Sequence, residues 1–260
     1  MRLSDCKTVE QIKAFIKSKY GFEIVLLKES LSTPPPIRVK EVVGNKVYIA
    51  FDRNHIDKQL IPVLIKHEIG HVVFQGAKEG VPVYYRGEDG LVSVIIGDFL
   101  KEWHVEVNIE HEKWYSLDEI NLRIKELLRT INNKMPPPEI KYAKMDPLVS
   151  LSELYDYPIF FLYNKQNMLV NSYKKKGYFI EARVLEKIAN ILRKNEKKAL
   201  KFYKEFVETD YFDIYNQIVP IGKKLVKKLW KIYGFDPIKL LNLLQRDPFL
   251  MNAAEELYNS

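Results

Sequence analysis

The hydrophobic positions near the start of the chain follow two periods, which predict a helix and then a strand. Residues 8–19 carry apolar side chains every three or four positions, as one buried face of a helix requires. Thr8 is placed as the N-cap of this helix and Gly21 as its stop. Residues 22–27 follow as a β-rich run, so we expect a strand directly after the helix.

A β-hairpin is predicted next in the chain. Residues 37–43 and 46–51 read as strands, and they flank Gly44 and Asn45, a pair typical of a two-residue hairpin turn. A helix, a strand and a hairpin thus precede the long helical patterns that follow. The predicted fold class is α+β.

Three further helices are predicted before the first clear boundary. The first begins near Pro62, ends at Gly76 and is apolar enough to be largely buried. Residues 91–112 and 118–131 show the period of amphipathic helices. The polar, glycine-rich residues 78–90, which separate the first of these helices from the second, are predicted to form a loop.

A run of three prolines divides the chain into two predicted domains. Met135, which is followed by Pro136–Pro138, marks this boundary because prolines cannot continue a helix and make stiff connectors. We expect one domain over residues 1–134 and a mainly α-helical, basic region over residues 139–260. Helices are predicted in that region over residues 148–163, 178–193, 197–207 and 214–233.

Composition points to a globular protein of the cytoplasm. The 260 residues carry a formal net charge of +7, and no segment has the apolar length of a membrane span. The first residues lack the apolar region of a signal peptide. With Cys6 as its single cysteine the chain forms no internal disulfide, which favours a cytoplasmic location.

The predicted helix between Pro62 and Gly76 contains the string His67-Glu68-Ile69-Gly70-His71. Two histidines four residues apart lie one turn apart on the same face of a helix, so both imidazoles can reach one metal ion. Glu68 can reach a water molecule on that ion. The chain has only five histidines, which makes a chance occurrence of this spacing rare. We therefore predict a metal site here.

A third ligand is expected from the helix over residues 91–112. Asp98, Glu102 and Glu106 are spaced at four residues and form one acidic line beside an apolar stripe. Carboxylates near the buried side of a helix need a partner, and a metal ion with its histidine ligands is one. Glu102 is the favoured ligand, while His104 and Glu106 remain alternatives.

These residues resemble the active site of the zincin superfamily of zinc metallopeptidases, and in particular the thermolysin-like gluzincins. The resemblance implies Zn²⁺ as cofactor, with His67, His71 and Glu102 as ligands, Glu68 as general base and Glu106 as the acid that orients a ligand histidine. Gluzincins usually have Asp where this chain has Glu106. No third histidine follows His71 at the metzincin spacing.

The same resemblance implies a fold and a substrate. The expected fold is a zincin-like core of a small β-sheet and active-site helices over residues 1–134, followed by the helical region. The edge strand of such a sheet can pair with an extended peptide substrate. A side chain that stabilises the oxyanion is also expected, and the candidates are Tyr84, Tyr85, His104, His111 and Tyr115.

A second hypothesis comes from the basic C-terminal region. Its clusters are Lys174–Lys176, Lys197–Lys198, Lys223–Lys224, Lys227–Lys228 and Lys231. Such a surface suits nucleic acid, an acidic partner or anionic lipid, although a solvated lysine face over a helical core is the favoured interpretation. The alternative function is a regulatory or binding protein on a zincin scaffold whose proteolytic activity is restricted or lost.

Overall fold

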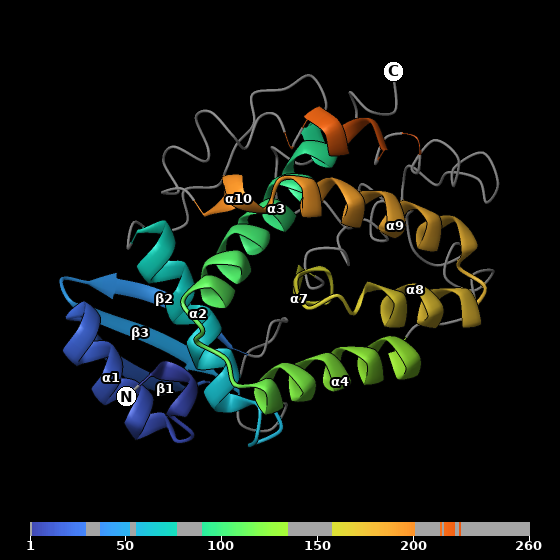
Figure 1. Ribbon diagram of the computed structural model, residues 1–260. Coiled ribbons are helices and arrows are strands. Elements are labelled where there is room, and N and C mark those ends of the chain that lie inside the picture. Colours follow the sequence, from blue (N-terminus) through green and yellow to red (C-terminus); the bar gives the residue numbers. More distant parts are fainter. Residues whose placement is uncertain are drawn as a thin grey trace. The chain divides into compact units, whose positions relative to one another are not determined.

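The computed structural model describes residues 2–29, 37–52, 56–76, 90–134, 158–200, 214, 216–221 and 224. The chain is α+β, mostly helical with a small three-stranded mixed sheet (Figure 1). Its contacts divide it into two compact units, and the division passes through one continuous helix between Trp103 and His104. None of the described helices combines the length and the apolar character that a membrane span requires.

The first unit begins with a short 3-10 helix, Leu3–Asp5, and helix α1, Val9–Tyr20. Thr8 caps α1: its hydroxyl accepts from the backbone N–H of Gln11, and the Gln11 side chain accepts in return from the backbone of Thr8. Gly21 ends the helix in the left-handed conformation, with φ of 78°. The predicted N-cap and stop residue are confirmed, and the helix ends one residue later than predicted.

The sheet consists of β1 (Glu23–Lys28), β2 (Ile37–Val43) and β3 (Lys46–Phe51) in the order β1-β3-β2. β2 and β3 form the predicted antiparallel hairpin, with an irregularity in register between Val39 and Glu41. β1 pairs with β3 in parallel, which local sequence could not show. β3 is therefore the central strand and β2 is an edge strand among the described residues.

Helix α2, Ile61–Gln75, carries the histidine pair, and it contacts α1, β2 and β3. Pro62 stands in its first turn and Gly76 caps its end, as predicted. Helix α3, Gly90–His111, and helix α4, Leu117–Lys134, follow. The predicted loop over residues 78–90 lies outside the described residues, except for Gly90, which begins α3.

Gly70 brings α3 close to α2. A Cβ atom at Gly70 would lie 2.9 Å from both Val105 Cγ1 and Ile109 Cδ1, closer than such atoms pack. Both of these side chains on α3 are fully buried. The absence of a side chain at Gly70 is thus what allows this part of α3 to pack against the face of α2 that carries His67 and His71.

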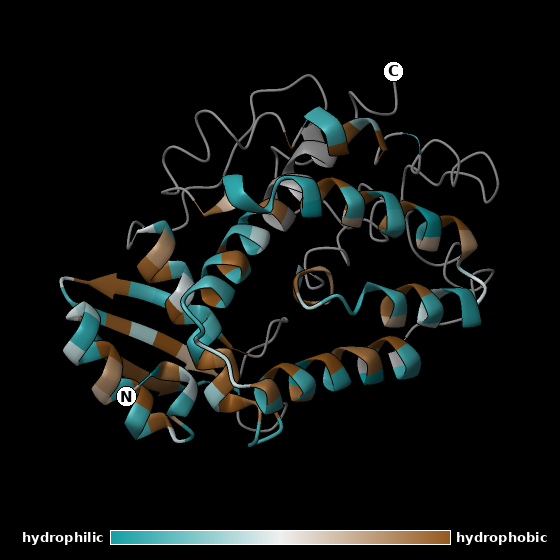
Figure 2. Ribbon diagram, viewed as in Figure 1, coloured by the Kyte–Doolittle hydropathy of each residue, from teal (hydrophilic) through white to brown (hydrophobic). Residues whose placement is uncertain are grey.

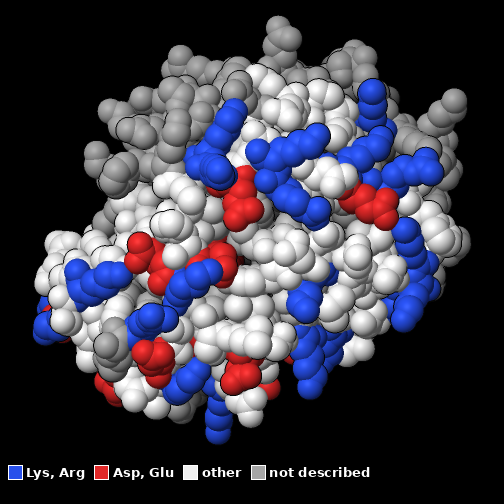
Figure 3. Space-filling model, viewed as in Figure 1, with Lys and Arg blue, Asp and Glu red and all other residues white. Residues whose placement is uncertain are grey.

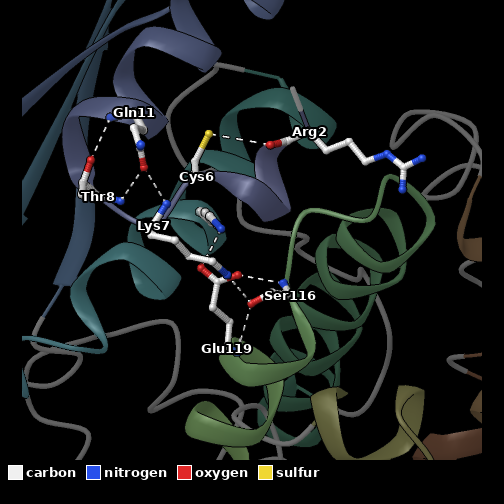
Figure 4. A network of polar contacts seen from close by, with 8 residues as sticks. Arg2, Cys6, Lys7, Thr8, Gln11, Ser116 and Glu119 are labelled. Atoms are coloured by element: carbon white, nitrogen blue, oxygen red, sulfur yellow. Dashed lines mark hydrogen bonds and ion pairs between the residues drawn. The ribbon is translucent and has the colours of Figure 1, made fainter.

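A buried ion pair fixes the start of α4 against α2. The Lys66 side chain is 0% exposed and its Nζ donates to Glu119 Oε1 at 2.6 Å. Glu119 Oε2 accepts from the backbone N–H of Ser116, so the same carboxylate caps α4. The Ser116 hydroxyl in turn accepts from Lys7 Nζ, which extends the network to the N-terminal segment (Figure 4).

The second unit contains the first part of α3, the end of α4 and a group of helices in mutual contact. These are α7 (Pro158–Leu162), α8 (Gln166–Lys175), α9 (Phe179–Lys194) and α10 (Glu196–Ala199). Figure 2 shows α9 with a hydrophobic and a hydrophilic side. Ala182, Leu185 and Leu192 are among its buried side chains.

The predicted helices of this unit agree with the structure in part. Residues 178–193 were predicted as a helix and correspond to α9. Of the pattern over residues 148–163, only the final part is described, and it contains α7. Of the pattern over residues 197–207, only the beginning is described, and it belongs to α10. Helix α8 was not predicted. The proposed boundary at Met135–Pro138 lies outside the described residues.

Substitution of Gly70 by valine is expected to separate α2 from α3. The added side chain overpacks a core of fixed volume, so the free energy of unfolding should fall by about 1–3 kcal/mol, measured by urea denaturation. Ala14→Val on the exposed face of α1 is the control, with an expected loss of about 0.5 kcal/mol from helix propensity alone. Equal losses in the two variants would contradict the close contact.

Substitution of Lys66 by methionine is expected to leave a largely buried carboxylate without its cation. The free energy of unfolding should fall by about 3–5 kcal/mol, measured in the same way. Addition of Glu119→Gln should recover part of this loss, because glutamine removes the charge and can still cap α4. A double variant no more stable than Lys66→Met would show that the pair is not the source of the loss.

Candidate metal centre

The two histidines of α2 turn their Nε2 atoms toward each other. His67 Nε2 and His71 Nε2 are 3.3 Å apart, and the two rings are nearly perpendicular, at 88°. Two nitrogen ligands at about 2.0–2.1 Å from a tetrahedral ion would be separated by about 3.3–3.4 Å. The spacing of the pair therefore fits a shared metal ion.

The other ring nitrogen of each histidine has a partner. His67 Nδ1 lies 2.8 Å from Glu106 Oε1, and His71 Nδ1 lies 3.0 Å from Gln75 Oε1. An ionised carboxylate and an amide oxygen only accept hydrogen bonds, so each Nδ1 is placed to donate to its partner, and each Nε2 would then offer its lone pair to an ion. Gln75 was not recognised in the sequence, although its position one turn after His71 could have indicated it.

Glu106 is held as an anion inside the protein. Its side chain is 1% exposed. Burial acts to raise its pKa, but the positive charge of Arg123 and the hydrogen bond from His67 outweigh this effect, and the pKa lies below its usual value. The structure thus places Glu106 behind His67, at the nitrogen that faces away from His71.

Glu102 lies one turn before Glu106 on α3. A carboxylate oxygen of Glu102 and a ring nitrogen from each of His67 and His71 lie within 4.8 Å of one another. Two imidazoles and one carboxylate form the donor set of a three-ligand catalytic zinc site. Among the described residues, the three favoured ligands are therefore close enough to bind one ion.

His104, the alternative ligand, contacts other side chains. It is 1% exposed, and its Nδ1 lies 3.5 Å from Gln75 Nε2 while its Nε2 lies 3.4 Å from Asn108 Nδ2. Because Gln75 also contacts His71, His104 belongs to a polar chain behind the second histidine of the pair. It is not part of the His67, His71 and Glu102 group.

Glu68 connects the motif helix to the sheet. Its Oε2 accepts a hydrogen bond from the backbone N–H of Val39 at 3.0 Å. Val39 belongs to the edge strand β2 and adjoins the irregularity in its pairing with β3. The carboxylate expected to act as general base is therefore positioned by a backbone group of the strand expected to bind substrate.

Arg123 on α4 is a further residue that sequence patterns did not reveal. Its Nη1 donates to Glu106 Oε1 and to the Tyr115 hydroxyl, the latter at 2.9 Å, and lies 3.3 Å from His67 Nδ1. Burial and the nearby Glu106 raise the pKa of Tyr115 well above its usual value, which keeps the phenol protonated. Through Arg123, Tyr115 is linked to the Nδ1 side of His67.

The remaining oxyanion candidates are placed as follows. His111 is exposed at the end of α3. Tyr84 and Tyr85 lie outside the described residues. Tyr115 and His104 are both linked to the site through groups at an Nδ1 atom, away from the two Nε2 atoms.

The basic clusters of the second unit lie on its surface where they are described. On α9, Arg183, Lys187, Arg193 and Lys194 are exposed, while Glu186 pairs with Lys174 at 3.0 Å. Figure 3 shows mostly blue side chains over α8, α9 and α10 on the face that it draws. The clusters from Lys227 onward are outside the described residues.

Comparisons of the chain with protein-family models, with curated proteins and with solved structures find no match in any of the three.

Alanine at Glu102 is expected to abolish zinc binding. Wild type and Glu68→Gln should each retain about one zinc ion per chain after dialysis, because Glu68 is not a ligand. Metal content is measured by inductively coupled plasma mass spectrometry. His104→Ala and Glu106→Ala test the alternative ligands, and Glu110→Ala, a surface position on α3 paired with Lys113, is the matched control. Full zinc content in Glu102→Ala would refute the assignment.

Proposed function

We propose that this protein is a zinc-dependent metallopeptidase with a zincin-like core. One observation carries the proposal: a ring nitrogen of His67, one of His71 and a carboxylate oxygen of Glu102 lie within 4.8 Å of one another, while the Nδ1 of each histidine has a partner of its own. Orienting partners of this kind accompany metal-binding histidines in general. The order of helix, sheet and motif helix is compatible with the resemblance noted in the sequence.

The proposed chemistry divides between the metal and Glu68. Zinc, when bound, would lower the pKa of a water molecule and polarise the carbonyl of the peptide bond. Glu68 would take a proton from that water and later deliver it to the leaving amine. The N–H of Val39 would keep the Glu68 carboxylate in place for both transfers.

The edge strand β2 supports a peptide substrate rather than a small molecule. An extended peptide can add to the free edge of a sheet through backbone hydrogen bonds. β2 lies at such an edge among the described strands and contacts α2 directly. A substrate strand paired there would run beside Glu68, because Glu68 is hydrogen-bonded to the same strand.

A regulatory or binding protein is the second candidate function. The observation that favours it is the exposed basic side of α9, which would suit an acidic partner or nucleic acid. Such a protein would have the same core, but its proteolytic activity would be restricted to one partner or would be lost.

Substitution of Glu68 by glutamine is expected to abolish peptide cleavage without loss of zinc. General-base catalysis contributes a factor of at least about 100, so turnover of a broad peptide library should fall by that factor or more, measured by mass spectrometry of the products. Glu110→Gln is the matched control and should cleave as wild type does. If zinc-loaded wild type cleaves nothing in the library, the second candidate function is favoured.

A further inference from the structure

Several contacts around the candidate metal centre converge on one oxygen atom. Glu106 Oε1 accepts from His67 Nδ1 and from Arg123 Nη1. The other oxygen, Oε2, is buried with no hydrogen-bond partner in the described part of the chain. The two donors on Oε1 alone therefore set the rotation of this carboxylate.

Arg123 is itself held from a second direction. Its Nη1 also donates to the hydroxyl of Tyr115, a side chain that is 6% exposed. Tyr115 lies in the short connection between α3 and α4, whereas Arg123 lies on α4 and Glu106 on α3. The hydrogen bonds of Arg123 to Glu106 and Tyr115 thus join three consecutive parts of the chain and restrict the position of the guanidinium.

The position of Arg123 bears on which nitrogen of His67 carries the proton. A guanidinium donates and never accepts, so it cannot replace Glu106 as the acceptor for His67 Nδ1–H. It holds Oε1 together with His67 and so keeps the carboxylate from swinging away from the ring. With that acceptor in place, His67 keeps its proton on Nδ1 and presents its lone pair at Nε2, the nitrogen that faces His71.

We propose that Arg123 is a positioning residue that locks Glu106 onto Nδ1 of His67 and so presents Nε2 of His67 to a metal ion. This role of Arg123 extends the proposed function, and the identity of the metal as zinc rests on that function. It does not depend on catalysis, because Arg123 acts through Glu106. Tyr115 serves as the second anchor of the guanidinium.

The first test uses the metal-free protein. Nitrogen-15 NMR of the histidine rings reports which nitrogen of His67 carries the proton. Wild type is expected to show His67 protonated at Nδ1, and Arg123→Met a mixture of both tautomers. Arg129→Met is the matched control on the exposed side of α4 and should give the wild-type spectrum. A wild-type tautomer in Arg123→Met would overturn the proposal.

The second test is a double-mutant cycle on zinc affinity, measured by competition with a chelator. Loss of a residue that supports a metal ligand weakens affinity by about 10–100-fold, and we expect about tenfold for Arg123→Met. In a Glu106→Gln background the same substitution should add little, because Arg123 acts through Glu106. Independent, multiplicative effects would overturn the proposal.

Two conservative variants cover the case in which Arg123→Met does not fold. Tyr115→Phe removes one anchor and should weaken zinc binding in the same direction but less. Arg123→Lys keeps the charge without the planar fork and should restore only part of the affinity. Wild-type affinity in both would overturn the proposal. Absence of zinc binding in wild type would refute the proposed function instead, and the NMR comparison would still decide the role of Arg123.

Discussion

Close packing of α2 against α3 at Gly70 is the constraint on which the candidate metal centre depends. His67 and His71 lie on either side of this glycine along α2, and Val105 on α3 is adjacent to Glu106 in sequence. A side chain at position 70 would push α3 outward and lengthen the contact between Glu106 and His67. The glycine between the two histidines therefore serves the packing of the two helices.

Much of the first unit was predictable because its signals are local. Thr8 and Gly21 mark the ends of α1 through hydrogen bonds within a few residues, and Gly44 and Asn45 set the hairpin register in the same way. The histidine pair was predictable because the helical period fixes its geometry. Helix α8 was missed because Lys165, the residue before it, makes no side-chain capping bond and because its sequence is mostly polar.

The supporting contacts of the site were not predictable because they join distant positions. Arg123 meets His67 from 56 residues away, and Lys66 meets Glu119 from 53 residues away. On a helix pattern alone, Lys66 and Arg123 look like ordinary surface cations. Only the packing of α4 shows that both are paired with buried carboxylates. Such charges disfavour any alternative position of α4, since each would leave a buried ion unpaired.

The irregular pairing of β2 has a consequence for association between copies of the chain. An open sheet edge is a template for unwanted pairing with another molecule. On β2 the register shifts at Lys40, and the exposed side chains around it are Arg38, Lys40 and Glu41. A kinked and charged edge resists growth into a continuous intermolecular sheet. Among the described strands, β2 is thus an edge strand whose charged side chains oppose pairing between identical molecules.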